Sequence, residues 1–135
     1  MVSLNVGDVV AIKCWWGEHW GIVGVSNGRL TLISNRGLKG AVTEEPVEDV
    51  IGSAEWNLVG LSRRLPAAIV VARARSKIGT AYDFWSWNCQ DLVYWALGLQ
   101  PQSPQRDAVV SLLTLAGVSV LLYMEIGRAS CRERV

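Results

Sequence analysis

The sequence is poor in histidine and cysteine, the residues that most often mark metal sites and disulfide frameworks. It has one histidine, His19, and three cysteines among 135 residues. One of the cysteines, Cys131, belongs to a terminal segment of foreign composition. One histidine with the widely separated Cys14 and Cys89 does not make the usual ligand set of a zinc site. Two cysteines do not make a disulfide framework either, so a reducing, intracellular environment is the simplest assumption. We therefore expect no metal ion and no cofactor.

Several signals of particular function classes are also missing. The formal net charge is only +1 and no basic stripe stands out, so nucleic acid is not an expected partner. The start, MVSLNVGDVV, lacks the charged and apolar regions of a secretory signal, which predicts a cytoplasmic or membrane-associated protein. No Gly-x-Ser-x-Gly elbow is present, which disfavours a serine hydrolase.

The terminal segment, residues 125–135, reads EIGRASCRERV and breaks with the composition before it. It can be back-translated into a common sequencing-adapter sequence, so we interpret it as a translated adapter and exclude it from the fold. We expect one domain over residues 1–124. Its last part, residues 108–124, is apolar and uncharged, which fits a helix that packs on the domain or lies at a membrane surface.

The remaining pattern predicts an antiparallel meander followed by helices, hence an α+β fold. Runs rich in β-branched residues predict strands over residues 8–14, 19–25, 29–34 and 56–61. Asn27-Gly28 is typical of a tight hairpin turn. Helices are expected from Pro66 to about residue 77 and over residues 89–97, with Asn88 as the N-cap of the second.

Cys89 is the strongest candidate for chemistry because it lies in the first turn of a predicted helix. Helix N-termini favour a thiolate and offer N–H groups to an oxyanion. The alternative is a core cysteine on an apolar helix face. His19 could serve such a thiol as its base, or be a structural histidine at a strand edge. Cys14 lies in phase with Val10 and Ile12, so we interpret it as a small buried hydrophobe.

Two sequence blocks resemble the lecithin:retinol acyltransferase-like family. The first is VGDVVAI…HWGIVG…NG, and the second is YDFWSWNCQDLVYWALG, in which Tyr82, Asn88, Cys89 and Gly98 stand at the family's spacing. The stretch LKGAVTEEPVEDV between them is similar to bacterial members. The resemblance covers most of residues 6–98. It implies a permuted papain-like fold in which an N-terminal antiparallel sheet carrying His19 packs against helices, one of which starts at Cys89.

The resemblance also implies a site. Cys89 would be the nucleophile, His19 the general base, and Tyr82 would line the site near the oxyanion. The family often has a second histidine as its third catalytic residue, and this chain has none; Ser34 or Asn35 falls near that position. The chain has seven tryptophans, several of which flank His19 and Cys89. The residues expected to line the substrate and oxyanion region are Tyr82, Asn88, Trp20 and Trp87.

Two functions follow as hypotheses. The first is a thiol hydrolase or acyltransferase, in which Cys89 attacks a lipid acyl or peptide-type ester or amide and forms a thioester. Its partners would be a small-molecule, lipid or peptide substrate and a membrane surface contacted through residues 108–124. The second is a catalytically weak or inactive interaction module that kept the fold but lost the third polar residue.

Overall fold

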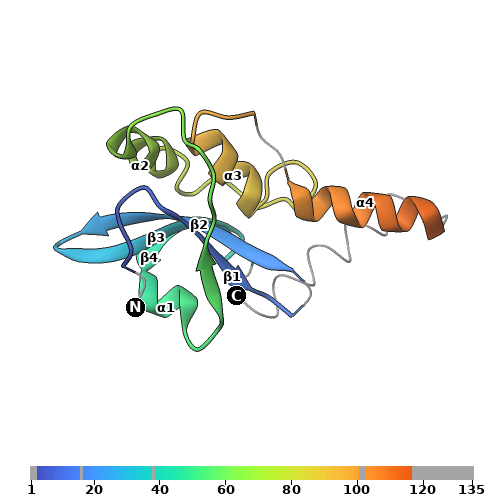
Figure 1. The fold of residues 1–135 in the computed structure, drawn as a ribbon, viewed down its shortest axis with the longest axis horizontal. Helices are drawn as coiled ribbons and strands as arrows, with labels where there is room; N and C mark the ends of the chain where they lie inside the picture. The colour runs from blue at the N-terminus through green and yellow to red at the C-terminus, as the bar shows by residue number, and fades with distance from the viewer. Residues whose placement is uncertain (1–2, 16, 38, 101–102, 117–135) are drawn as a thin grey trace.

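The computed structural model describes residues 3–15, 17–37, 39–100 and 103–116. A five-stranded antiparallel sheet forms its centre, in the order β4-β3-β2-β1-β5 (Figure 1). The strands are β1 (Val9–Lys13), β2 (Glu18–Ser26), β3 (Arg29–Arg36), β4 (Ala41–Pro46) and β5 (Trp56–Leu58). The α+β class and the predicted meander are therefore confirmed.

The β2–β3 hairpin turns at the predicted dipeptide. Asn27 and Gly28 have φ angles of 52° and 76°, the positive values that a tight turn between twisted strands requires. Two differences from the sequence prediction follow the hairpin. Residues 41–46, for which no strand is predicted above, form a full edge strand, β4, and the strand expected over residues 56–61 shortens to β5. The short helix α1 (Val47–Ile51) separates them.

The helices cover both faces of the sheet and define two cores. Helices α2 (Ala67–Arg75) and α3 (Cys89–Ala96) lie on one face, and α1 lies on the other (Figure 1). On the α2 and α3 face, side chains from alternate positions of β1 and β2 pack with α3 in the larger core, which we call the helix-side core. The intervening positions point to the opposite face and form a smaller core with Val50 of α1. Both faces of β1 and β2 are thus buried.

The last described helix, α4 (Pro104–Ala116), points away from the sheet and from α3 (Figure 1). It begins before the predicted residue 108, and Leu112 and Leu115 are 67% and 88% exposed. The expectation that these leucines pack on the domain is therefore wrong. Residues 117–124 lie outside the described part. Among the described helices, none has the length and apolar character needed to cross a membrane. Contact with a membrane surface stays a prediction.

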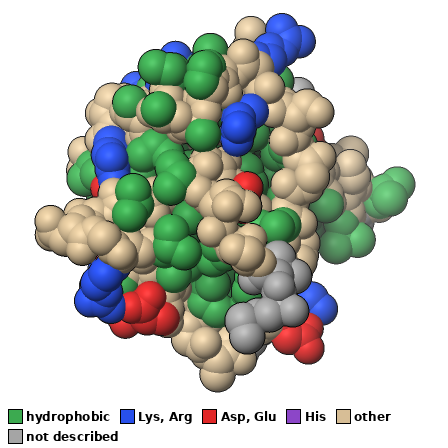
Figure 2. Space-filling model, turned by 60° about the vertical axis from the view of Figure 1, so that its left-hand side comes forward, with side chains coloured by type: hydrophobic (Ala, Val, Ile, Leu, Met, Phe, Trp, Pro, Cys, Tyr) green, Lys and Arg blue, Asp and Glu red, His purple; other side chains and the backbone are tan. Residues whose placement is uncertain are grey.

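The molecular surface is mixed in character. On the face drawn in Figure 2, Lys and Arg side chains are scattered among hydrophobic and polar ones and form no continuous stripe. Among the described residues as a whole, several basic side chains are paired with acids, as in the contacts of Arg75 with Glu44 and of Lys13 with Glu55, both at 2.8 Å. This face offers no extended basic track.

Candidate functional site

The N-terminus of α3 is capped as the sequence predicts. The side-chain oxygen of Asn88 accepts hydrogen bonds from the main-chain N–H groups of Gln90 and Asp91, at 3.0 and 3.2 Å. The Asp91 carboxylate accepts the Asn88 N–H at 3.0 Å, which completes a capping box. Cys89 is the first residue of this helix. The local geometry is therefore the one that favours a thiolate, provided that a base can remove the thiol proton.

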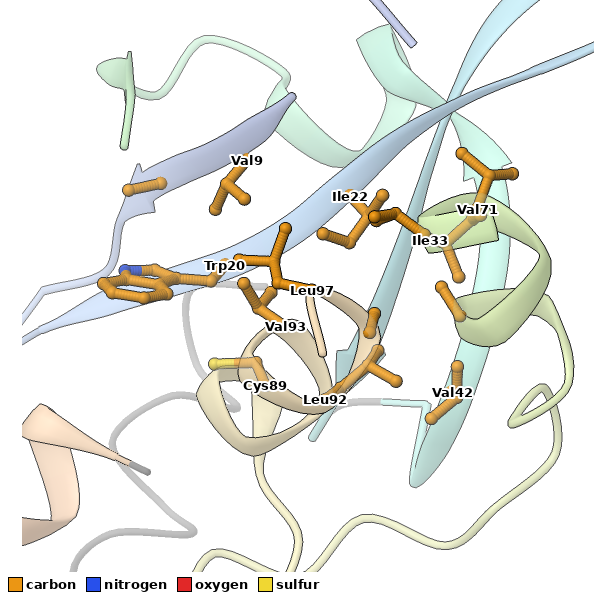
Figure 3. Close-up of a cluster of buried hydrophobic side chains, with 14 residues drawn as sticks. Val9, Trp20, Ile22, Ile33, Val42, Val71, Cys89, Leu92, Val93 and Leu97 are labelled. Atoms are coloured by element: carbon orange, nitrogen blue, oxygen red, sulfur yellow. The ribbon is translucent and has the colours of Figure 1, made fainter. Parts of the chain in front are cut away.

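The Cys89 thiol is buried. Its residue is 1% exposed and belongs to the helix-side core together with Trp20 and Leu92 (Figure 3). The thiol donates a hydrogen bond to the main-chain carbonyl of Glu18, with a sulfur–oxygen distance of 3.8 Å. A thiol that donates must carry its proton, so this arrangement stabilises the neutral form and not the nucleophilic thiolate.

His19 points to the other face of the sheet. In the β1–β2 register it stands opposite Ile12, while Trp20 stands opposite Ala11. Directly opposed residues of an antiparallel pair share a face, and successive residues alternate. Ile12 belongs to the smaller core, whereas Ala11 and Trp20 belong to the helix-side core with Cys89. The backbone of β2 therefore separates the imidazole of His19 from the sulfur of Cys89.

The surroundings of His19 also make it a weak base. The residue is 1% exposed, and its Nε2 has no hydrogen-bond partner among the described residues. Burial, helped by the positive charge of Arg36 and opposed by Glu45, lowers the pKa of His19 from 6.5 to about 3. The imidazole is thus neutral near pH 7 and has little affinity for the proton that a general base must take.

The remaining predicted residues divide between the two faces. Ser34 is paired with Gly21, two positions from His19, and shares the face of His19. Asn35 is on the Cys89 face, where its side-chain amide donates to the Trp87 carbonyl at 2.8 Å. The other members of the predicted set are Trp20, which is buried in the helix-side core, Trp87, which packs against it, Asn88, which caps α3, and Tyr82, whose N–H donates to Gly40 O at 2.9 Å.

The predicted catalytic pair is therefore corrected. His19 and Cys89 do not meet in this structure, and the two candidates for a third residue are split, Ser34 with His19 and Asn35 with Cys89. The physical reason is the register. Glu18 and Trp20 occupy the positions of β2 that face α3, which leaves His19 for the opposite face.

Sequence reasoning missed a polar network that joins α3 to the first turn of α4. The Gln90 side-chain oxygen accepts hydrogen bonds from Ser103 Oγ and from the Gln105 N–H, at 2.7 and 2.9 Å. Arg106 contacts Asp91 at 2.7 Å, and Ser103 is fully buried. The signal was present as Ser103-Pro104, because serine followed by proline is a typical helix start.

A cavity of about 390 Å³ lies where the start of β2, the first turn of α3 and α4 meet. Gln90 and Gln105 contribute to its wall, and Cys89 itself does not line it. Nowhere in the described ranges are three His, Cys, Asp or Glu side chains close enough to hold a metal ion. Glu18 and Trp20, the neighbours of His19, and Gln90, the neighbour of Cys89, line this cavity, so it lies beside the predicted site.

Comparisons with known proteins add no assignment. No protein-family model matches the chain, and no curated protein matches it in sequence.

Proposed function

We propose that this chain is a permuted papain-like domain of the lecithin:retinol acyltransferase-like kind that acts as a non-catalytic interaction module. The order of elements supports the fold: an antiparallel meander precedes a helix that begins at Cys89 and packs on the sheet. One observation carries the function. The only histidine of the chain points to the face of the sheet opposite the thiol.

Two further observations support the same function. A thiol becomes a nucleophile when its proton is removed, so the state of that proton and the basicity of the histidine both bear on catalysis. The proton of Cys89 is engaged with Glu18 O, and the depressed pKa of His19 makes it a poor acceptor. The module would use its surface and cavity to bind a small molecule or peptide.

The second candidate is the thiol hydrolase or acyltransferase. What favours it is the place of Cys89 as the first residue of a helix with a complete capping box, since the N–H groups at a helix start suit an oxyanion. It requires the segment around Glu18 and His19 to change register and bring the imidazole to the α3 face. In that case Cys89→Ala would abolish esterase activity, whereas Cys14→Ala would leave it largely unchanged.

Thiol alkylation distinguishes the two candidates. In a Cys131→Ser background, Cys89→Ala leaves Cys14 as the only thiol, and Cys14→Ala leaves Cys89. We expect both proteins to react with iodoacetamide at pH 7 slowly and at comparable rates by mass spectrometry, because both cysteines are buried. Adding His19→Gln to the Cys14→Ala protein should leave the Cys89 rate unchanged.

The opposite result would support the enzyme. A Cys89 rate far above that of Cys14, slowed by His19→Gln, would mean that an activated pair forms in solution and would overturn the module. A trapped acyl-thioester on Cys89 after incubation with p-nitrophenyl acetate would lead to the same conclusion. Circular dichroism of each variant checks that its fold is intact.

A further inference from the structure

The segment around α2 is basic and contains no acidic residue. Between Trp56 and Tyr82 there are five Lys and Arg residues and no Asp or Glu. One of the five, Arg75, is bound to Glu44 at 2.8 Å. Within the described ranges the other four make no ion pair: Arg63, Arg64, Arg73 and Lys77. The surface over α2 therefore carries positive charge that is not paired with a carboxylate of the described ranges.

Two of these cations lie on tryptophan rings. Arg73 Cζ is 4.1 Å from the centroid of the Trp95 ring on α3, and the guanidinium donates to the Trp95 carbonyl at 2.8 and 3.3 Å. The Lys77 ammonium is 4.7 Å from the Trp95 centroid and 5.9 Å from that of Trp87. A cation–π contact holds a cation in place without cancelling its charge, because the ring carries no net charge. Arg73 and Lys77 therefore present positive charges at defined positions.

An arginine and an isoleucine extend this surface. The Arg64 main-chain N–H donates to the Leu97 carbonyl at 3.0 Å, so exposed Arg64 and Arg73 both flank the C-terminal end of α3. Ile69, which is 47% exposed, stands one helical turn before Arg73 on the same side of α2. We call the surface formed by Arg64, Ile69, Arg73 and Lys77 the basic face.

The basic face suits an acidic peptide better than other anionic partners. The side of the Trp95 ring that Arg73 covers cannot stack on a nucleobase, which is how single-stranded nucleic acids are bound. The other exposed positions in the middle of α2, Ala68 and Ala72, are too small to anchor in a bilayer, where Trp, Phe or Leu side chains insert. A second copy of the chain is disfavoured because four of its glutamates are already in ion pairs: Glu44, Glu45, Glu48 and Glu55.

We propose that the basic face docks an acidic segment of a partner protein. The Nη1 group of Arg73 and the ammonium of Lys77 donate to none of the described residues, so both can donate to carboxylates. Carboxylates of the segment contact Arg64, Arg73 and Lys77, and an apolar side chain between them lies against Ile69. The inference rests on the proposed function, because it names the kind of partner that the interaction module binds.

The test measures binding of the full chain to fluorescein-labelled peptides by fluorescence anisotropy at low salt and pH 7. One peptide is a tandem repeat of Glu-Glu-Leu, and its control has Gln in place of every Glu. We expect the Glu peptide to bind at least about tenfold more tightly, as several partly exposed ion pairs together would give. Raising the salt concentration should reduce the difference between the two peptides.

Charge-matched variants make the test specific. Lys77→Gln should weaken binding of the Glu peptide about threefold, the effect of one partly exposed ion pair, and Arg64→Gln with Lys77→Gln about tenfold. Lys13→Gln removes the same charge from an exposed position of β1 and should leave the affinity unchanged. Ile69→Asp places a like charge on the basic face and should weaken binding at least as much as Lys77→Gln. Circular dichroism checks that each variant is folded.

Equal binding of the two peptides, or no binding of either, would overturn the proposal. So would a loss in Lys13→Gln as large as that in Lys77→Gln. Vesicles containing phosphatidylserine, or oligo(dT), that bind more tightly than the Glu peptide and are lost in the double variant would assign the basic face to a membrane or a nucleic acid instead. Self-association in sedimentation experiments that the double variant abolishes would make a second copy the occupant, which also contradicts the proposal.

Failure of this inference can be told apart from failure of the proposed function. The alkylation rate of Cys89 is measured without any peptide present. A rapidly reacting Cys89 would overturn the non-catalytic function and leave the peptide result standing. A Glu peptide that does not bind would overturn the basic face as a docking site and leave the thiol result standing.

Discussion

The Cys89 thiol donates its hydrogen to the carbonyl of Glu18, at a sulfur–oxygen distance of 3.8 Å. The N–H of the same Glu18 residue donates to the side chain of Gln105 on α4. The start of β2 is therefore held between two helices, by α3 on one side and α4 on the other. This placement brings Glu18 to the α3 face, and the alternation of the strand then sends His19 to the opposite face.

Replacing the thiol tests how far Cys89 is structural. We expect Cys89→Ala to lower the free energy of unfolding by about 1 kcal/mol, because it removes one buried sulfur and a weak hydrogen bond. Leu92→Ala, at a fully buried position of the same helix, should cost about 2–5 kcal/mol. Urea denaturation measures both. A loss at Cys89 as large as that at Leu92 would show that the thiol is essential to the fold.

His19 should make the stability depend on pH. Its pKa is about 3 in the folded chain and about 6.5 when unfolded, so between these values the unfolded chain binds the extra proton. Stability should therefore fall as the pH drops below 6.5, by about 1.4 kcal/mol per unit, or about 2 kcal/mol at pH 5.

Urea denaturation between pH 5 and pH 7 checks this slope. His19→Gln should remove it whatever its effect on stability at pH 7, since the chain has no other histidine. An unchanged slope in the variant would mean that another group titrates. A flat profile in the unmodified chain would mean that the imidazole is not buried as described.

The cap of α3 gives a third prediction. Asn88 is fully buried; its oxygen caps α3, and its amide donates to the Phe84 carbonyl and to Ser103 Oγ, both at 2.9 Å. We expect Asn88→Ala to cost about 2–3 kcal/mol, because it removes the cap and leaves buried groups without partners. Thermal or urea unfolding measures the loss.

Asn57→Ala is the matched control, since Asn57 is exposed and its side-chain amide donates to the carbonyl of its neighbour Leu58. It should change stability by less than about 0.5 kcal/mol. Equal losses at the two positions would show that the capping network around Asn88 adds no more stability than an exposed amide does.

Local patterns predicted the fold better than they predicted the site. Asn27-Gly28 and Asn88 could be placed from the sequence because a turn and a helix cap depend on a few neighbouring residues. The face of the sheet on which the His19 side chain lies could not be predicted in this way. Val9 and Ile22 are buried on one face of the sheet, and Val10 and Val23 are buried on the other. A strand buried on both faces loses the apolar–polar alternation that would indicate the direction of each side chain.

The cavity was missed for a related reason. Its wall joins Glu18 to α4, and that contact depends on where α4 begins. The apolar run suggested residue 108, whereas the helix starts at Pro104, and this first turn carries the groups that bind α3. Polar residues that anchor a helix are absent from a hydrophobic pattern, so a prediction from apolar periodicity starts the helix too late.

The last prediction concerns the close approach of β2 and β3. A Cβ atom at Gly21 would lie 2.6 Å from Leu32 Cγ, well inside van der Waals contact, on the face that also holds His19. Gly21→Ala should therefore destabilise the chain by about 1–3 kcal/mol. Gly60→Ala is the control, because its Cβ would meet nothing within 4 Å. It should be neutral or stabilising by less than about 1 kcal/mol.

A double variant tests whether Leu32 is the group that Gly21 accommodates. The stability loss of Gly21→Ala combined with Leu32→Ala should be smaller, by at least about 1 kcal/mol, than the sum of the losses of the two single variants, because the double variant has no clash. Additive losses in urea denaturation would show that Leu32 is not what Gly21 accommodates, and the register that separates His19 from Cys89 would lose this support.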